Sequence, residues 1–69
     1  MTYRQLSRKL RALGCEFDRQ ARGSHVLWRN PATGTKASIP DWGSKDLKAG
    51  TISAILRDLR ISRSDFERS

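Results

Sequence analysis

The chain has few of the residues from which metal and redox sites are built. It contains one cysteine, Cys15, and one histidine, His25. A single cysteine excludes an intramolecular disulfide and a cysteine metal cluster, and we expect Cys15 to be a small core residue. One histidine with scattered carboxylates cannot supply the three or four ligands of a metal site. Glycine-rich phosphate loops are also absent, so we expect no metal and no small-molecule cofactor.

Long hydrophobic runs are absent as well. No apolar stretch approaches the roughly 20 residues that cross a bilayer. The N-terminal segment intersperses leucines with Arg4, Arg8 and Arg11, and therefore lacks the continuous apolar stretch of a signal peptide. Together with the single thiol, this indicates a cytoplasmic protein with no membrane partner. The 69 residues suit one domain, 1–69, near the lower size limit for a core without disulfides.

Acidic residues are scarce relative to basic ones. The chain has 14 Lys and Arg against 7 Asp and Glu, which gives a formal net charge of +7. Such an excess on a small surface is typical of a protein that binds a polyanion. Nucleic acid fits best, because neutralising its phosphates releases counterions. The alternative, that the positive charge only keeps the domain soluble, stays open at this point.

The first residues predict an amphipathic helix. Thr2, followed three residues later by Gln5, has the form of a capping box. Gly14 stands where a left-handed C-cap is expected. Between them the apolar residues recur at spacings of three and four, as on one face of a helix: Tyr3, Leu6, Leu10 and Leu13.

The middle of the chain predicts three antiparallel strands. A half-buried strand begins with the apolar residues Cys15 and Phe17, which alternate with polar ones. A second strand is expected over residues 24–30, where three adjacent apolar residues leave the buried face ambiguous. Proline and glycine in residues 31–34 predict a hairpin turn, and residues 35–39 alternate again as a third strand.

The last third of the chain predicts a loop and a second helix. Residues 41–50 have the composition of an irregular surface loop. A helix then opens at Gly50 and Thr51, and Ser62 begins a short final turn that places Phe66 against the core. The helix has one apolar stripe, made of Ile52, Ile55, Leu56 and Leu59.

These elements predict an α+β fold of order α-β-β-β-α. Both helices have a single apolar stripe, so we expect them side by side on one face of a three-stranded antiparallel sheet. The opposite face of the sheet is then left to solvent or to a ligand.

His25 is the side chain that can exchange protons near neutral pH. It stands at the start of a strand, directly after a turn expected near Arg22 and Gly23. A general base at this position can take the proton of a ribose 2′-OH, so that the oxygen attacks the adjacent phosphate without a metal. Basic groups nearby would stabilise the charge that develops. On composition alone, a structural role is the more common one for a lone histidine.

Basic residues near the predicted turns are candidates for phosphate contacts. They are Arg22, Arg29, Lys36, Lys45 and Lys48. Gly50 and Thr51 begin a helix whose free backbone N–H groups can bind a phosphate, or which is simply capped. Trp42 can stack on a base or cover the end of the core.

Five short motifs stand in order along the chain: Leu13-Gly14-Cys15-Glu16-Phe17, Gly23-Ser24-His25, Ile39-Pro40, Leu47-Lys48-Ala49-Gly50-Thr51-Ile52, and Ile55-Leu56 ahead of Ile61-Ser62. Each is weak alone, but their order and spacing resemble the HicA (YcfA-like) toxin family over nearly the whole chain. The resemblance implies a fold similar to double-stranded RNA-binding domains. It also implies an mRNA-cleaving endoribonuclease toxin that a HicB-type antitoxin holds inactive.

The resemblance places the family's catalytic histidine at His25, with Gly23 and Ser24 beside it. Ser24 and Thr51 join the candidate RNA contacts, and Gly23 and Gly50 form the structural frame of the site. One departure concerns the segment after the strand-ending Pro40. Many relatives have another histidine there, whereas Asp41 and Trp42 follow here. Either His25 suffices, or this copy is weakened.

Three hypotheses follow. The first is a metal-independent endoribonuclease toxin with His25 as general acid or base and mRNA as substrate. The second is a noncatalytic RNA-binding module of the same fold, which reads helix shape through 2′-OH and phosphate contacts. The third is an adaptor that binds DNA or only protein.

Overall fold

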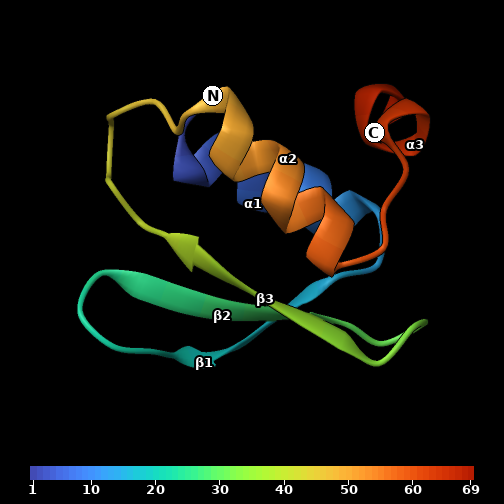
Figure 1. Ribbon diagram of the computed structural model, residues 1–69, viewed down its shortest axis with the longest axis horizontal. Coiled ribbons are helices and arrows are strands. Elements are labelled where there is room, and N and C mark those ends of the chain that lie inside the picture. Colours follow the sequence, from blue (N-terminus) through green and yellow to red (C-terminus); the bar gives the residue numbers. More distant parts are fainter.

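The protein is a three-stranded sheet with its helices on one face. The computed structural model describes residues 1–69. The elements are α1 (Tyr3–Ala12), β1 (Glu16–Gln20), β2 (His25–Asn30), β3 (Thr35–Pro40), α2 (Ala49–Asp58) and α3 (Arg63–Arg68). The strands are antiparallel in the order β1-β2-β3, and Figure 1 shows the helices on the same side of the sheet. The predicted α+β order is therefore confirmed, and it fits the topology expected from the resemblance.

Helix α1 begins and ends as its local sequence predicts. The Gln5 N–H donates to Thr2 Oγ1 (3.2 Å) and the Thr2 N–H donates to Gln5 Oε1 (2.9 Å), which completes a capping box. At the other end Gly14 has φ +91°. The Cys15 N–H then donates to the Leu10 carbonyl (2.9 Å), so the chain leaves the helix in a Schellman motif.

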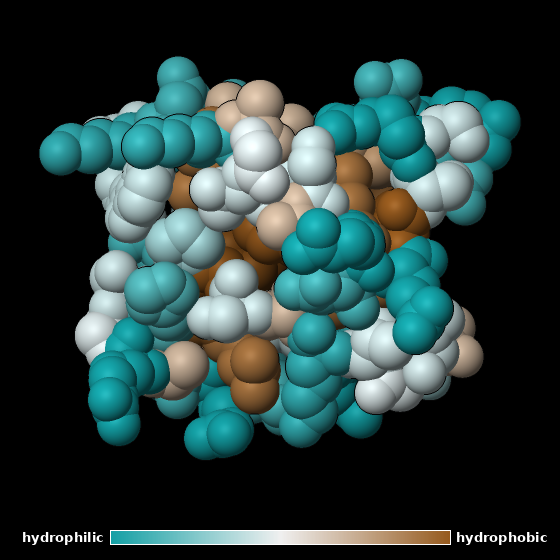
Figure 2. Space-filling model, viewed as in Figure 1, coloured by the Kyte–Doolittle hydropathy of each residue, from teal (hydrophilic) through white to brown (hydrophobic).

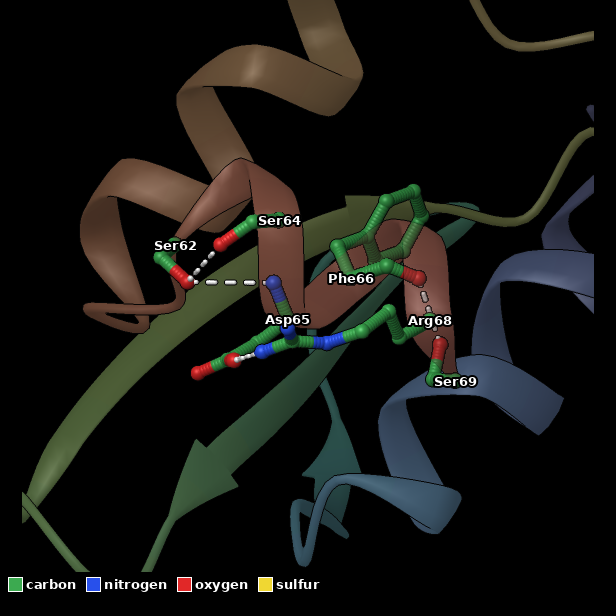
Figure 3. A network of polar contacts seen from close by, with 6 residues as sticks. All are labelled: Ser62, Ser64, Asp65, Phe66, Arg68 and Ser69. Carbon is green, nitrogen blue, oxygen red and sulfur yellow. Dashed lines mark hydrogen bonds and ion pairs between the residues drawn. The ribbon is translucent and has the colours of Figure 1, made fainter.

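Helix α2 begins at Ala49, one residue before the predicted start. Its predicted apolar stripe, from Ile52 to Leu59, is buried against the sheet. Helix α3 is the short final turn expected from the sequence. Ser62 caps it by accepting from the Asp65 N–H (3.1 Å), as Figure 3 shows, and Phe66 is buried.

The register of β2 resolves which of its faces is buried. Val26 pairs with Ile39 and Trp28 pairs with Ala37, and all four side chains are buried beneath the helices. His25, Leu27 and Arg29 alternate with them and therefore lie on the opposite, open face of the sheet. The three adjacent apolar residues of this strand thus point to both faces.

Strand β1 departs from the predicted alternation because it contains a bulge. Phe17 pairs with Trp28, but Arg19 rather than Asp18 pairs with Leu27. One extra residue in β1 reverses the faces of the residues that follow. Phe17 stays on the helix side, yet 49% of its surface is exposed, because β1 is an edge strand. The expectation that Phe17 contributes to a half-buried face is wrong.

The core lies between the sheet and the helices. Thirteen buried hydrophobic residues form one cluster, with Trp28, Leu6, Leu10, Ile39 and Leu59 the largest fully buried side chains. Figure 2 shows hydrophobic residues mainly between the helix layer and the sheet, with hydrophilic residues around the rim. Cys15 belongs to this cluster, as predicted, and burial raises the pKa of its thiol.

Asn30 is a buried polar residue that links the sheet to α2. Its Nδ2 donates to the Leu59 carbonyl (2.8 Å), and its Oδ1 accepts from the Ala32 N–H (3.1 Å). Both polar atoms of the amide are therefore satisfied, which offsets the cost of their burial. None of the helices is long and apolar enough to cross a membrane.

Candidate functional site

His25 begins β2 at a tight turn that follows β1. Gly23 has φ +61°, a conformation that favours glycine, which explains this residue in the predicted turn. The His25 N–H donates to the Arg22 carbonyl (3.1 Å), and the His25 carbonyl accepts from the Ala21 N–H (2.9 Å). These backbone bonds fix the position of His25 while its side chain stays exposed on the open face of the sheet.

The side chain of Gln20 braces this turn. Its Nε2 donates to the Gly23 carbonyl (3.2 Å) and to the His25 carbonyl (3.1 Å). Gln20 reaches the turn although it pairs with Val26, on the helix side of the sheet. The turn is therefore held by hydrogen bonds to backbone atoms, and none of them engages the imidazole of His25.

The β1 bulge brings Arg19 onto the open face next to His25. Arg19 pairs with Leu27, two residues along β2 from His25, so Arg19 and His25 are diagonal neighbours on one face. Such neighbours have Cβ atoms about 7–8 Å apart, within reach of a long side chain. Arg19 is exposed and forms none of the ion pairs of the molecule. Sequence reasoning missed it, because simple alternation places it on the opposite face.

The segment between β3 and α2 is attached to the His25 turn. The Asp41 N–H donates to the Ser24 carbonyl (2.9 Å), directly beyond the pairing of His25 with Pro40. Predicted site residues Ser24 and His25 are thereby brought next to the loop that carries Lys45. Arg22 lies in the same turn and is exposed.

Two shallow hollows open on this loop. One is lined by Asp41, Trp42 and Lys45. The other lies between the loop and the start of α1, and is lined by Thr2, Tyr3, Arg4, Asp41, Gly43 and Ser44. Sequence reasoning missed Arg4 and Asp41 as members of this surface, because their proximity results from the docking of the loop against α1.

Arg29 and Lys36 lie at the other end of the open face. Arg29 lies four positions along β2 from His25, which is about 13 Å of strand. Each is already paired with a carboxylate: Arg29 with Glu16, and Lys36 with Asp18 (3.1 Å). The structure does not bring these two predicted phosphate contacts to the same phosphate as His25.

Lys48, Gly50 and Thr51 lie in the helix layer at the start of α2. Lys48 is the N-cap residue and offers no side-chain hydrogen bond to the first turn, so that turn has no side-chain cap. No hydrogen bond or ion pair joins these residues to the His25 turn. They form a basic helix start that is separate from the His25 turn.

No group of three or more His, Cys, Asp or Glu side chains is arranged to hold a metal ion. The open face carries the imidazole of His25 and the guanidinium of Arg19. An imidazole can accept or donate a proton, and a guanidinium can donate two hydrogen bonds to a phosphate.

A family model described as the HicA toxin of bacterial toxin-antitoxin systems matches residues 3–61. The match runs from the first residue of α1 to Ile61, three residues past the end of α2, and includes the whole sheet. The chain belongs to the HicA toxin family. No curated protein and no solved structure matches the chain significantly.

Membership of the HicA family identifies the chain as a toxin-type component of a toxin–antitoxin pair. The matched range contains the His25 turn, the β1 bulge and the loop that carries Trp42. The short helix α3 lies beyond it. His25, Arg19 and Trp42 thus all lie within the residues that match the HicA family model.

Proposed function

We propose that this HicA family member is a cytoplasmic endoribonuclease toxin that cleaves mRNA with His25 as its general acid or base. The observation that carries the proposal is the exposed His25 imidazole beside Arg19 on the open face of the sheet. A proton-transferring group next to a cation is the combination that 2′-OH attack on a phosphate requires. Family membership supports a toxin that acts on a cellular target.

The proposed reaction is a transesterification. His25 takes the proton of a ribose 2′-OH, and the 2′ oxygen forms a bond to the adjacent phosphorus. The bond from phosphorus to the 5′ oxygen breaks, and that oxygen takes up a proton from solvent. The products are a 2′,3′-cyclic phosphate and a 5′-hydroxyl, and His25 then returns its proton to solvent. Arg19 stabilises the negative charge on the phosphate oxygens during this step.

The other cations hold the RNA on either side of the reacting phosphate. Arg22 and Ser24 lie within the His25 turn, and Lys45 lies in the loop attached to it. Arg29 and Lys36 bind a phosphate further along the open face. The phosphate then replaces Glu16 as the partner of Arg29 and Asp18 as the partner of Lys36. Lys48 and Thr51 bind a phosphate at the start of α2, where Gly50 lets the backbone approach closely.

The ends of the cleaved RNA test this reaction. We expect a 2′,3′-cyclic phosphate on the upstream fragment, and full cleavage in the presence of EDTA because none of the proposed steps uses a metal ion. A substrate with a 2′-deoxyribose at the scissile nucleotide should resist cleavage. A plain 3′-hydroxyl end, or cleavage of the deoxy substrate, would contradict the proposal.

We also propose a HicB-type antitoxin as the protein partner. The open face carries His25 and a cation, so an acidic surface on the antitoxin can cover it by charge complementarity. Co-expression with a HicB-type antitoxin should abolish cleavage and yield a complex that weakens in high salt. Purification of the toxin alone from such cells would argue against that partner.

Two observations favour a second function, that of a noncatalytic RNA-binding module. No side chain orients the imidazole of His25, and the segment after Pro40 carries Asp41 and Trp42 rather than a second histidine. Binding of RNA without cleavage, unchanged in His25→Ala and strongly weakened by salt, is the result this alternative predicts.

A further inference from the structure

We propose that Trp42 forms a base-stacking subsite for the nucleotide next to the reacting phosphate. The inference rests on the proposed function for the identity of the ligand, single-stranded RNA. It goes beyond that function by assigning a binding role to an aromatic residue outside the catalytic pair.

Trp42 is one of two exposed large aromatic residues, and the other, Phe17, lies on the edge strand β1. The Trp42 side chain is 40% exposed, whereas Trp28 is fully buried and Phe66 is 4% exposed. The indole belongs neither to the core cluster nor to the partly buried hydrophobic residues packed against it. An exposed indole offers a flat apolar surface on which any base can stack.

The loop that carries Trp42 is fixed by hydrogen bonds. Gly43 has φ +63°, and its N–H donates to Asp41 Oδ1 (3.1 Å). The Lys45 N–H donates to the Trp42 carbonyl (3.2 Å). These turns order the loop before a ligand binds. Binding therefore costs less conformational entropy than it would with a flexible loop.

The position of the loop places Trp42 within one or two nucleotides of His25. His25 pairs with Pro40, and paired Cα atoms in an antiparallel sheet lie about 4.5–5.5 Å apart. Two further residues of chain add at most about 7 Å, so the Cα atoms of His25 and Trp42 lie within about 12 Å. The Asp41 N–H bond to the Ser24 carbonyl maintains this proximity.

The charges around the indole favour a base over a phosphate. The hollow is lined by Asp41, Trp42 and Lys45. A carboxylate at this point repels a phosphate and can accept a hydrogen bond from a base amino group. Lys45, which lines the same hollow, can bind the phosphate of the same nucleotide. The three side chains together therefore match one nucleotide: its base on Trp42 and its phosphate on Lys45.

Intrinsic fluorescence tests this subsite, because Trp42 is accessible and Trp28 is not. We would titrate the protein with a fluorescently labelled 2′-O-methyl oligonucleotide, which 2′-OH attack cannot cleave. Binding should quench the emission of Trp42 in a saturable way. In Trp42→Phe the quenching should disappear, while anisotropy of the labelled oligonucleotide shows affinity close to that of the unmodified protein, because phenylalanine still stacks.

Trp42→Ala should weaken binding roughly 5- to 150-fold, the range that alanine substitution gives at base–aromatic stacks. The unchanged emission of Trp28 reports that this variant is folded. Binding without quenching, or equal affinity of Trp42→Ala, would overturn the subsite. Failure of the protein to bind RNA would overturn the subsite as well. So would quenching of the Trp42 emission by a protein ligand but not by RNA.

A cleavage assay separates this inference from the proposed function. If the oligonucleotide quenches the Trp42 emission but the protein cleaves no RNA, the subsite is supported and the ribonuclease activity is contradicted. Cleavage that depends on His25, with the same KM in Trp42→Ala, keeps the ribonuclease and removes the subsite.

Discussion

Arg19 and His25 share a surface because of one extra residue in β1. Without the bulge at Asp18, Arg19 would follow Phe17 on the helix side of the sheet. With it, Arg19 lies opposite Leu27 and diagonal to His25 on the open face. Asp18 itself forms an ion pair with Lys36 (3.1 Å), which lies opposite Arg29 at the other end of the open face from His25. The bulge thus supplies the proposed catalytic residue with a cation that has no carboxylate partner.

Arg19→Ala should reduce the rate of RNA cleavage about 10²-fold, the effect of removing one donor to a developing oxyanion. Arg29→Ala is the matched control, because Arg29 lies on the same face but at the far end of β2 and is already paired with Glu16. Single-turnover cleavage of a short RNA measures both. Equal losses in the two variants would show that only total charge matters.

The pH dependence of stability tests the burial of the Cys15 thiol in the core. Burial raises the pKa of this thiol, so the neutral thiol is favoured in the folded state. The resulting contribution to stability is complete below the unfolded pKa, about 8.5, and is lost as the pH rises through the higher folded pKa. The unfolding free energies of the protein and of Cys15→Ala should therefore converge at alkaline pH, as measured by urea unfolding. A difference independent of pH would contradict the burial of the thiol.

The helices and hairpins of the chain differ in how far local sequence specifies them. The capping box at Thr2, the left-handed Gly14 and the turn at 31–34 each depend on residues within one turn, and each was predictable. The bulge in β1 was not, because it exists only through pairing with β2. The burial of Asn30 was missed for the same reason, since its partner is the distant Leu59.

Asn30 should be important for joining the sheet to α2. Asn30→Asp keeps the acceptor for the Ala32 N–H but loses the donor to the Leu59 carbonyl and brings a carboxylate toward it. We expect a loss of about 1–3 kcal/mol in the free energy of unfolding, as for an unsatisfied buried polar group. Asn30→Ala, which removes both hydrogen bonds, is the comparison. If Asn30→Asp unfolds at the same urea midpoint as the unmodified protein, the hydrogen bonds of the Asn30 side chain contribute nothing to stability.

Most of the Lys and Arg side chains of the molecule form no ion pair with a carboxylate. Four of the 14 Lys and Arg side chains are in ion pairs with carboxylates. Several of the others lie in segments that gather at one end of the molecule in Figure 1: the start of α1, the β1–β2 turn and the segment leading to α2. They are Arg4, Arg22, Lys45 and Lys48. Composition predicted the excess charge, but only the fold shows where it collects.

This distribution predicts which cations determine the salt dependence of RNA binding. Each phosphate contact on a single strand contributes about 0.7 to the slope of log K against log salt concentration. Lys45→Ala should lower that slope by about this amount. Lys36→Ala should lower it less, because Lys36 must first release Asp18. Filter binding of uncleavable RNA over a series of salt concentrations gives both slopes, and the reverse order would contradict the placement of the RNA.

The substitution His25→Ala tests the account most directly. The imidazole is exposed and only the backbone of His25 is hydrogen-bonded, so the urea midpoint should not change. We expect this variant to lose RNA cleavage and growth arrest on expression. It should still bind RNA and the antitoxin. Full growth arrest and cleavage by folded His25→Ala protein would contradict the proposed catalytic role.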